Sequence, residues 1–337
     1  MVELFYYSQK LQGIEVHRYF LILPKKLNMS IAILTNHKDP TTWKKALQEK
    51  LPNVAINIVA TNQVALNAEF LVCWKPKKDQ LAAFPNLKVI QSLGAGVDHI
   101  FDTNKIKEEI KVVRIVDPNL MIDMWEYTLA ATMNYLKDFP VYAQQAQTAT
   151  WQQHQYKTIP TTTVSIMGLG KIGGYVAAQF AKFGFKVQGW SNSLKNIKGV
   201  KTFAGQAHLA DFLRNTDVLI NILPLTATTK GILNRQLFTQ LPKGAHIINV
   251  GRGGHLIEKD LIPLVENGQL SGATLDVFQE EPLPENHSFW AHPKIVVTPH
   301  IASLTNVQSA VNQVVENYQR MNKGTDLLNE VSSKKGY

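Results

Sequence analysis

The sequence is poor in cysteine, in long apolar runs and in metal-binding clusters. Its 337 residues include a single cysteine, Cys73, so an intrachain disulfide is impossible and a reducing, cytoplasmic compartment is expected. No apolar run approaches the roughly 18 residues that span a bilayer, so we expect no membrane segment. No histidine, cysteine or carboxylate residues have the spacing of metal ligands, so we predict no metal site.

The positive charge is not concentrated in one part of the sequence. A net charge of +9 could indicate a nucleic-acid partner, but the basic residues are scattered. The only short clusters, Lys75–Lys78 and Lys334–Lys335, are small and are expected to be solvated surface. Because no basic stripe alternates with aromatic residues, we expect no nucleic-acid partner. The composition, 45% hydrophobic and 18% charged, is that of a globular chain long enough for two domains.

The first half of the chain alternates between apolar runs and amphipathic stretches. Residues 1–28 precede a second methionine, Met29. They are an upstream N-terminal extension, the product of an alternative start, or an N-terminal strand or arm on the surface; the sequence leaves these open. From Ser30 to Ile115, alternation of strands and helices predicts a parallel sheet covered on both faces. The four expected strands are "SIAIL", "AINIVA", "FLVCW" and "LKVIQSL".

The second half predicts a dinucleotide fold. A long apolar stretch, 120–139, is expected to be one buried helix, and six apolar strands with intervening helices follow between Thr161 and Pro299. A last amphipathic helix spans roughly 306–321. The predicted fold class is α/β, with two Rossmann-like doubly wound domains. The dinucleotide-binding domain, 119–301, is inserted into a flavodoxin-like domain made of 29–118 and 302–337.

A glycine motif lies where the first strand of this second half ends. Gly168, Gly170 and Gly173 have the spacing G-x-G-x-x-G, between an apolar strand and an amphipathic helix. The first glycine permits a tight turn, the second lets a pyrophosphate approach the helix N-terminus, and the third lets helix and strand pack closely. We therefore expect a dinucleotide here, contacting also Lys171 and Ile172, although a purely structural turn is the alternative.

The loop after the next strand lacks a carboxylate. NAD sites usually carry an acidic residue about 20 residues after the glycines, but no Asp or Glu occurs between Gly173 and Asp211. Small polar side chains and a lysine stand there instead and could hold a 2′-phosphate. NADPH is thus the predicted cofactor, with NADH possible; the alternative is an ordinary polar loop in an NAD enzyme. The expected contacts are Ser191, Asn192, Ser193 and Lys195.

Three further strand ends carry a guanidinium, a carboxylate and an imidazole. Arg252, Glu281 and His300 each follow a predicted strand, and strand C-terminal ends line the ligand crevice of such sheets. Arginine can grip a planar carboxylate, and an imidazolium can protonate a carbonyl oxygen as hydride reaches its carbon. The carboxylate would orient the imidazole and favour its charged form. Together they suit reduction of a 2-oxo acid, although each alone could be an ordinary surface or boundary residue.

Five stretches give the chain a family resemblance. "GLGKIG", "LPLTATTKGIL", "INVGRGG", "LDVFQEEPLP" and "TPHIAS" occur in the order and spacing of the D-isomer-specific 2-hydroxyacid dehydrogenases. The resemblance covers about Ser30 to Tyr337. Within the family the chain most closely resembles the bacterial glyoxylate/hydroxypyruvate reductase A subgroup, through "LGAGVDHI", "QEEPLPENHSFWAHP" and the terminal "GY". Close relatives tend to carry arginines in the loop after Trp190, where this chain reads "SNSLKN".

The resemblance implies roles for residues along both predicted domains. Arg252 would bind the substrate carboxylate, Glu281 would support the charged imidazole and His300 would be the general acid. Asp276 would hydrogen-bond the nicotinamide carboxamide. Further cofactor contacts are expected at Leu223, Pro224, Val250 and Gly251.

The substrate side of the site is expected at the end of a first-half strand. The resemblance implies that the amides of Ala95 and Gly96 complete the carboxylate cradle, and the glycines around them suit an anion-binding backbone turn. A tight strand-to-helix turn is the alternative. Trp74, after another strand, would either wall the substrate pocket or belong to the core.

Other functions remain open at the level of sequence. A D-lactate or aromatic 2-oxo acid dehydrogenase would share these motifs and differ in pocket size. A nicotinamide-sensing binding protein of the same fold could keep the same residues without catalysis. The apolar residues of 120–139 cover most faces of the expected helix, which, with the resemblance, predicts a homodimer built around it.

Overall fold

The structure is a computed structural model that describes residues 6–11, 14–19, 30–36, 39–59, 67–101 and 106–332. Much of the expected extension 1–28, and the cluster Lys334–Lys335, lie outside the described residues. Two described pieces of the extension, β1 (Tyr6–Leu11) and β2 (Ile14–Tyr19), pair as an antiparallel hairpin that joins neither larger sheet.

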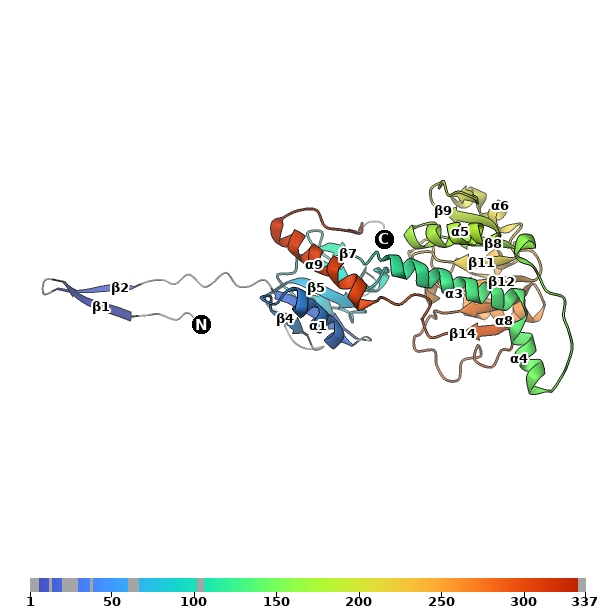
Figure 1. Ribbon diagram of the computed structural model, residues 1–337, viewed down its shortest axis with the longest axis horizontal. Helices are drawn as coiled ribbons and strands as arrows, with labels where there is room; N and C mark the ends of the chain where they lie inside the picture. The colour runs from blue at the N-terminus through green and yellow to red at the C-terminus, as the bar shows by residue number, and fades with distance from the viewer. Residues whose placement is uncertain are drawn as a thin grey trace.

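A five-stranded parallel sheet forms the first domain (Figure 1). Its strand order, β4-β3-β5-β6-β7, is the doubly wound order of flavodoxin-like folds. Residues of β3 alternate between two cores: Ile31 and Ile33 pack with α1 and α9, whereas Ala32 and Leu34 face η1 and α2. The strands are β3 (Ser30–Thr35), β4 (Ile56–Ile58), β5 (Ala68–Trp74), β6 (Val89–Ser92) and β7 (Lys111–Val113); the helices are α1 (Pro40–Lys50), η1 (Gln80–Ala83), α2 (Asp98–Phe101) and α9 (Val307–Lys323).

A seven-stranded parallel sheet forms the second domain, in the order β10-β9-β8-β11-β12-β13-β14. With β8 as the first strand, this is the dinucleotide-binding order, extended by one strand at the β14 edge. The strands are β8 (Thr163–Met167), β9 (Lys186–Ser191), β10 (Val200–Ala204), β11 (Val218–Asn221), β12 (Ala245–Asn249), β13 (Leu270–Leu275) and β14 (Ile295–Val297). The predicted α/β class with two parallel sheets is therefore confirmed.

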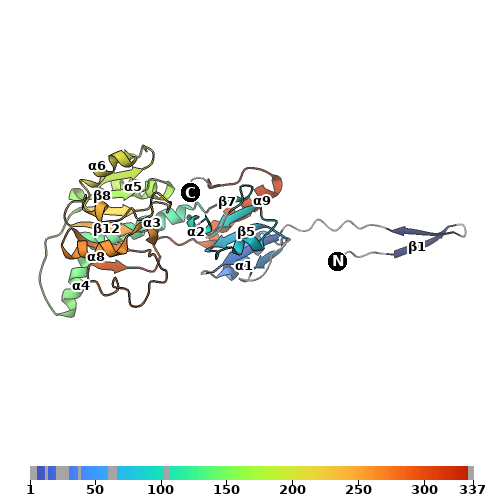
Figure 2. The ribbon, with the colours of Figure 1, turned by 180° about the vertical axis from the view of Figure 1, so that it is seen from behind.

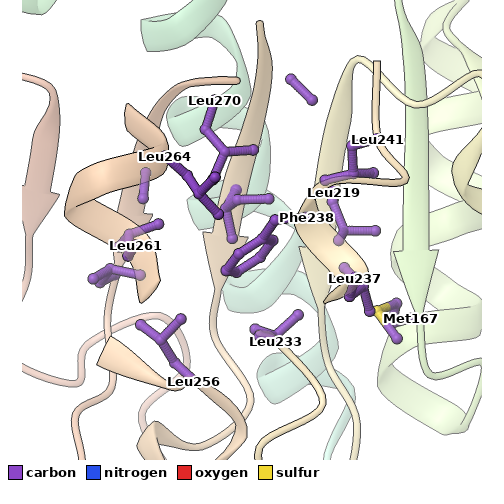
Figure 3. Packing of buried hydrophobic residues seen from close by; sticks show 14 of the residues in the cluster. Met167, Leu219, Leu233, Leu237, Phe238, Leu241, Leu256, Leu261, Leu264 and Leu270 are labelled. Atoms are coloured by element: carbon purple, nitrogen blue, oxygen red, sulfur yellow. The ribbon is translucent and has the colours of Figure 1, made fainter. Parts of the chain in front are cut away.

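Helices cover both faces of the second sheet (Figure 2). The helices α3 (Pro118–Leu136) and α5 pack on one face around Phe180, and α6, α7 and α8 pack on the other around Phe238. Figure 3 shows this second cluster, with Leu261 and Leu264 from α8 facing Phe238. The elements are α5 (Lys171–Phe183), η3 (Gln206–His208), α6 (Leu209–Leu213), α7 (Arg235–Phe238), η4 (Gly253–His255) and α8 (Glu258–Glu266).

Three expectations about the elements need correction. The stretch 120–139 is not one helix: α3 (Pro118–Leu136) ends before Asp138, which has a left-handed backbone, and α4 (Phe139–Gln147) then begins. The second sheet has seven strands rather than the six expected, because the prediction did not include β10. The first sheet has five strands rather than the four expected, because the prediction did not include the three-residue β7. Both missed strands lie at sheet edges, and the residues of β10 are partly or fully exposed, which weakens an apolar pattern.

The chain crosses between the domains twice, and the crossings lie side by side. The first leads into α3 and the second runs from His300 to α9. Ser303 Oγ on the second donates to Leu120 O on the first at 2.9 Å, and Val116 N donates to Gln313 Oε1 at 3.2 Å. These bonds make the two crossings one narrow hinge between the sheets. A short 3-10 turn, η2 (Ile159–Thr161), then precedes β8.

Candidate active site

The glycine turn after β8 has the shape that a pyrophosphate needs. Gly168 has φ of 103°, and a Cβ there would lie 2.8 Å from Ile222 O. A Cβ at Gly173 would lie 1.8 Å from Gly168 O, so helix and turn touch. A Cβ at Gly170, the N-cap of α5, would meet nothing within 4 Å, and no side chain caps this helix. Open space in front of uncapped amides fits a dinucleotide phosphate.

The segment expected to cover the cofactor runs beside this turn. Leu223 N lies 3.0 Å from the position of a Gly168 Cβ. The Leu223 side chain is buried in the core, whereas Pro224 is exposed. Val250 and Gly251, which follow the neighbouring strand β12, are both buried. The structure therefore brings these expected cofactor contacts to one edge of the sheet.

The loop after β9 is mostly open to solvent. Asn192, Ser193 and Lys195 are exposed, and Ser191 is buried at its base. The Ser191 hydroxyl donates to Ser193 O at 2.8 Å, so it would have to turn away from this carbonyl to donate to a phosphate. Lys195 O accepts from Thr202 Oγ1 at 2.7 Å, which fixes the backbone of the loop.

His300 and Glu281 form a direct pair. His300 Nδ1 lies 2.9 Å from Glu281 Oε2, and the side chains are 33% and 21% exposed. Glu281 Oε1 accepts from Phe278 N at 3.2 Å. Burial acts to raise the pKa of Glu281, but the bonds with His300 and Lys75 outweigh burial and lower that pKa to about 2. Glu281 is thus an anion that holds Nδ1 of the imidazole and leaves Nε2 for other partners.

Asp276 holds the segment that carries His300. Its Oδ1 accepts from Thr298 Oγ1 at 2.7 Å and from Ile301 N at 2.8 Å, and its Oδ2 accepts from Ala302 N at 2.8 Å. Burial, which outweighs these bonds, raises the pKa of Asp276. His300 has φ of 56°, a left-handed conformation that is uncommon for non-glycine residues. The carboxylate therefore supports a strained turn; its expected contact with a nicotinamide stays a prediction.

Arg252 reaches across to the other domain. Its Nε lies 3.0 and 2.9 Å from the two oxygens of Asp98, and its Nη1 donates to Gly251 O at 2.8 Å. Burial opposes ionisation of Asp98, but the charge of Arg252 and its hydrogen bonds lower the pKa of Asp98 overall. A Cβ at Gly96 would lie 1.7 Å from Arg252 Nη2. The remaining guanidinium nitrogen therefore lies against the backbone of the 94–98 loop.

The structure brings the expected carboxylate cradle together. Among described residues, neither the Ala95 amide nor the Gly96 amide donates a hydrogen bond to the protein, and Gly96 lies against Arg252. Trp74 covers this loop: a Cβ at Gly94 would lie 2.6 Å from its ring. The Trp74 ring also packs on His99, with centroids 4.4 Å apart, and on the edge of the core. Trp74 is thus half-buried between the core and the cradle.

Three residues at the site were missed from the sequence. His255, fully buried, accepts from Arg252 N at 3.0 Å and contacts Pro224 O at 3.2 Å; burial lowers its pKa and keeps it neutral. Asp98 lies in the quoted "LGAGVDHI" stretch but was given no role. Lys75 was expected to be solvated surface, and this is wrong, because its Nζ lies 3.0 Å from Glu281 Oε2. Lys75 and Asp98 carry no distinguishing sequence signal, since their partners lie 206 and 154 positions away along the chain.

The fold and the site are those of one class of enzymes. Two doubly wound domains that are joined by two adjacent crossings, with a dinucleotide-type glycine turn in one domain, are typical of the two-domain nicotinamide-dependent dehydrogenases. The model of the family "D-isomer specific 2-hydroxyacid dehydrogenase, NAD binding domain" matches residues 129–302. The chain belongs to the D-isomer-specific 2-hydroxyacid dehydrogenase family.

The chain is similar in sequence to known members of this family over most of its length. It is 40% identical over 300 residues to glyoxylate/hydroxypyruvate reductase A of Yersinia enterocolitica, covering 88% of this chain and 96% of the relative. The Photorhabdus laumondii protein of the same name is 38% identical over 304 residues, covering 89% and 97%.

The structure is also similar to solved structures of this family. An NADPH-dependent glyoxylate/hydroxypyruvate reductase of Sinorhizobium meliloti, solved with NADP and sulfate, has a TM-score of 0.86 and 33% identity, covering 92% of this chain and all of that one. A D-isomer-specific 2-hydroxyacid dehydrogenase of Xanthobacter autotrophicus, solved with NADPH and MES, gives the same TM-score, identity and coverage.

Among the residues that the structure describes, no three His, Cys, Asp or Glu side chains are placed to hold a metal ion. Within those residues, no helix is both long and apolar enough to cross a bilayer.

Proposed function

We propose that this protein reduces a small 2-oxo acid, such as glyoxylate or hydroxypyruvate, to the D-2-hydroxy acid with a nicotinamide cofactor. The observation that carries the proposal is the His300–Glu281 pair at the same sheet edge as Arg252, which bonds the opposite domain. When bound, the reduced cofactor supplies a hydride to the carbonyl carbon. The names of the curated relatives support the substrate class.

Arg252 is proposed to bind the substrate carboxylate. Its Nε is engaged by Asp98 and its Nη1 by Gly251 O, which leaves Nη2 beside Gly96. The Ala95 and Gly96 amides donate to the same carboxylate. Charge-assisted bonds from a guanidinium are strong and directional, so this cradle fixes the orientation of the carbonyl group.

His300 is proposed to donate the proton. Nδ1 is bonded to Glu281, so Nε2 is the nitrogen that carries the transferable proton to the carbonyl oxygen. Glu281 stays ionised and stabilises the imidazolium before transfer. The carbon gains the hydride, the oxygen gains the proton, and the imidazole is left neutral.

NADPH is the proposed cofactor, with NADH possible. Two of the similar structures were solved with NADPH or NADP. The loop of Ser191, Asn192, Ser193 and Lys195 has no carboxylate to repel a 2′-phosphate, and Lys195 offers a positive charge. Lys171 and Ile172, at the start of α5, are proposed to border the pyrophosphate.

A spectrophotometric screen tests the function. NADPH and NADH are each mixed with glyoxylate, hydroxypyruvate, pyruvate and phenylpyruvate, and absorbance loss is followed. Fastest turnover of glyoxylate or hydroxypyruvate with NADPH is expected. Preference for pyruvate or phenylpyruvate would favour a D-lactate or aromatic oxo-acid dehydrogenase. Cofactor binding without turnover of any acid would favour a nicotinamide-sensing protein.

We also propose a homodimer that uses α3 and the segment after it. Leu120, Met124 and Leu136 of α3 are buried within one chain, so they need no partner. Phe139 is 60% exposed and Trp151 is 99% exposed, which leaves aromatic surface beyond α3 for a second copy. Light scattering at micromolar concentration should give the mass of a dimer, and a monomer mass would contradict it. We propose further that the dinucleotide-binding domain comprises residues 119–301, inserted between 29–118 and 302–337 of the other domain.

A cytoplasmic location is also proposed.

A further inference from the structure

Lys75 reaches from the first domain into the His300–Glu281 pair of the second. Its Nζ lies 3.0 Å from Glu281 Oε2, the same oxygen that lies 2.9 Å from His300 Nδ1. The side chain of Lys75 is 32% exposed and that of Glu281 is 21% exposed, so water screens this bridge less than it screens a surface ion pair.

The backbone around Lys75 is held in an unusual conformation. Lys75 follows β5 with φ of 48°, in the left-handed region that non-glycine residues seldom adopt. Its N–H donates to His99 Nδ1 at 3.2 Å, and its carbonyl accepts from Asn36 Nδ2 at 2.6 Å. Trp74 packs on the same histidine. These contacts fix the direction in which the Lys75 side chain leaves the strand.

The charge of Lys75 changes the balance of proton transfer. With Lys75 present, the three side chains carry one net positive charge before His300 gives up its proton and are neutral afterwards. Without Lys75, they would be neutral before and carry one unpaired negative charge afterwards. An uncompensated charge is costly in a half-buried site. Lys75 therefore favours release of the proton.

Other charged groups near the imidazole do not offer this balance. Asp276 lies close to His300, but both of its oxygens are held by Thr298 and backbone amides. Arg252 and Asp98 bond each other. The imidazole of His99 contacts the Lys75 backbone rather than its ammonium group. Among described residues, Lys75 is the only lysine or arginine that bonds Glu281.

We infer that Lys75 is a positioning residue that makes the His300 imidazolium a stronger acid, and that it does so only when the two domains meet. The inference rests on the proposed function, in which His300 is the proton donor. Lys75 touches neither substrate nor cofactor in this role and acts through Glu281.

The test removes the charge and keeps the length of the side chain. Lys75→Met is compared with Lys75→Arg and with a control, Lys88→Met, which breaks another lysine–carboxylate pair of the same domain, Lys88–Glu69 at 3.0 Å. A unit charge within roughly 6 Å of the imidazole should move its titration by about one pH unit. Lys75→Met should therefore shift the alkaline limb of kcat/KM for reduction upward by about one pH unit.

The reverse reaction sharpens the test. Oxidation of the D-2-hydroxy acid needs neutral His300, so its acidic limb should shift upward as well. Oxidation should then fall about fivefold at the wild-type midpoint and about tenfold well below it. Lys75→Arg should restore the wild-type profile, and Lys88→Met should leave it unchanged. If Lys75 merely held Glu281 in place, its loss would weaken support for the imidazolium and shift both limbs downward, which would overturn the inference.

A measurement without catalysis separates this inference from the proposed function. The imidazole signal of His300, assigned by its loss in His300→Gln, is followed by NMR against pH in the cofactor-free protein. A midpoint about one pH unit higher in Lys75→Met supports the inference, and an unchanged or lower midpoint overturns it. If the midpoint shifts but the wild type reduces no 2-oxo acid, the coupling stands and the proposed function fails.

Discussion

His300 and Arg252 both bond a carboxylate, but the two carboxylates come from different parts of the molecule. The partner of His300 is Glu281, from the loop after β13 of the same domain. The partner of Arg252 is Asp98, from the other domain. The proposed acid and its carboxylate thus come from one domain, with Lys75 of the other domain only adjusting the acidity, whereas the proposed anchor and its carboxylate come from two domains. Proton transfer and substrate recognition can therefore be disturbed separately.

The largest effect is expected from removing the acid. His300→Ala should lower kcat by a factor of about 10² to 10⁴, because the imidazole is the proposed donor of the proton to the carbonyl oxygen. Cofactor binding, followed by fluorescence, should persist, since the glycine turn is untouched. His208→Ala, at an exposed histidine of η3, is the control and should behave as wild type. Near-wild-type turnover by His300→Ala would remove the assignment.

The cross-domain pair should respond in KM. Arg252→Ala should raise KM for the 2-oxo acid about a hundredfold, because charge-assisted bonds to its carboxylate are lost. Asp98→Asn keeps the shape but weakens the hold on Arg252, and should raise KM about tenfold with less change in kcat. Asp211→Asn, in the exposed Arg214–Asp211 pair, is the matched control and should change neither. A fall in kcat with constant KM in both site variants would contradict the separation.

The same contrast explains what the sequence could predict. The glycine turn, Arg252, Glu281 and His300 all follow apolar strands of one sheet, so strand periodicity and the C-terminal-edge rule bring them together. Lys75 and Asp98 bond residues 206 and 154 positions away, in the other domain. No local sequence pattern predicts these contacts, because they depend on how the two domains are placed relative to each other. The α3–α4 break was missed for a related reason: a single left-handed residue, Asp138, interrupts a continuous apolar stretch.

The cofactor loop should give a smaller effect. A partly exposed charge contact of about 1 to 2 kcal/mol predicts a roughly five- to thirtyfold preference for NADPH over NADH in kcat/KM. Ser191→Asp should reverse this preference, because a carboxylate repels the 2′-phosphate and accepts from the ribose diol. Measuring both cofactors on both proteins decides the question. A wild type that favours NADH would mean that the loop does not bind phosphate.

The smallest effect concerns stability against acid. The pKa of Glu281 is lowered to about 2 from its ordinary 4.5, so its bonds stabilise the fold above about pH 4.5 and are lost as the pH falls toward 2. After allowance for solvent screening, the contribution is about 1 kcal/mol. Glu281→Gln should therefore have a lower Tm than wild type at pH 6, measured by calorimetry. The difference in Tm between the two proteins should be smaller at pH 3. A difference in Tm that is the same at both pH values would show that the charge of Glu281 does not contribute to the stability of the fold.

Gly96 leaves room for a side chain from the other domain. The space between its Cα and the guanidinium of Arg252 is too narrow for a methyl group, since a Cβ would lie 1.7 Å from Nη2. The two domains are therefore in contact here, and the missing side chain of Gly96 lets the guanidinium reach the backbone of the other domain. An alanine at this position would displace the guanidinium of Arg252. The absence of a single carbon atom at residue 96 is thus a condition for binding the substrate carboxylate in the proposed way.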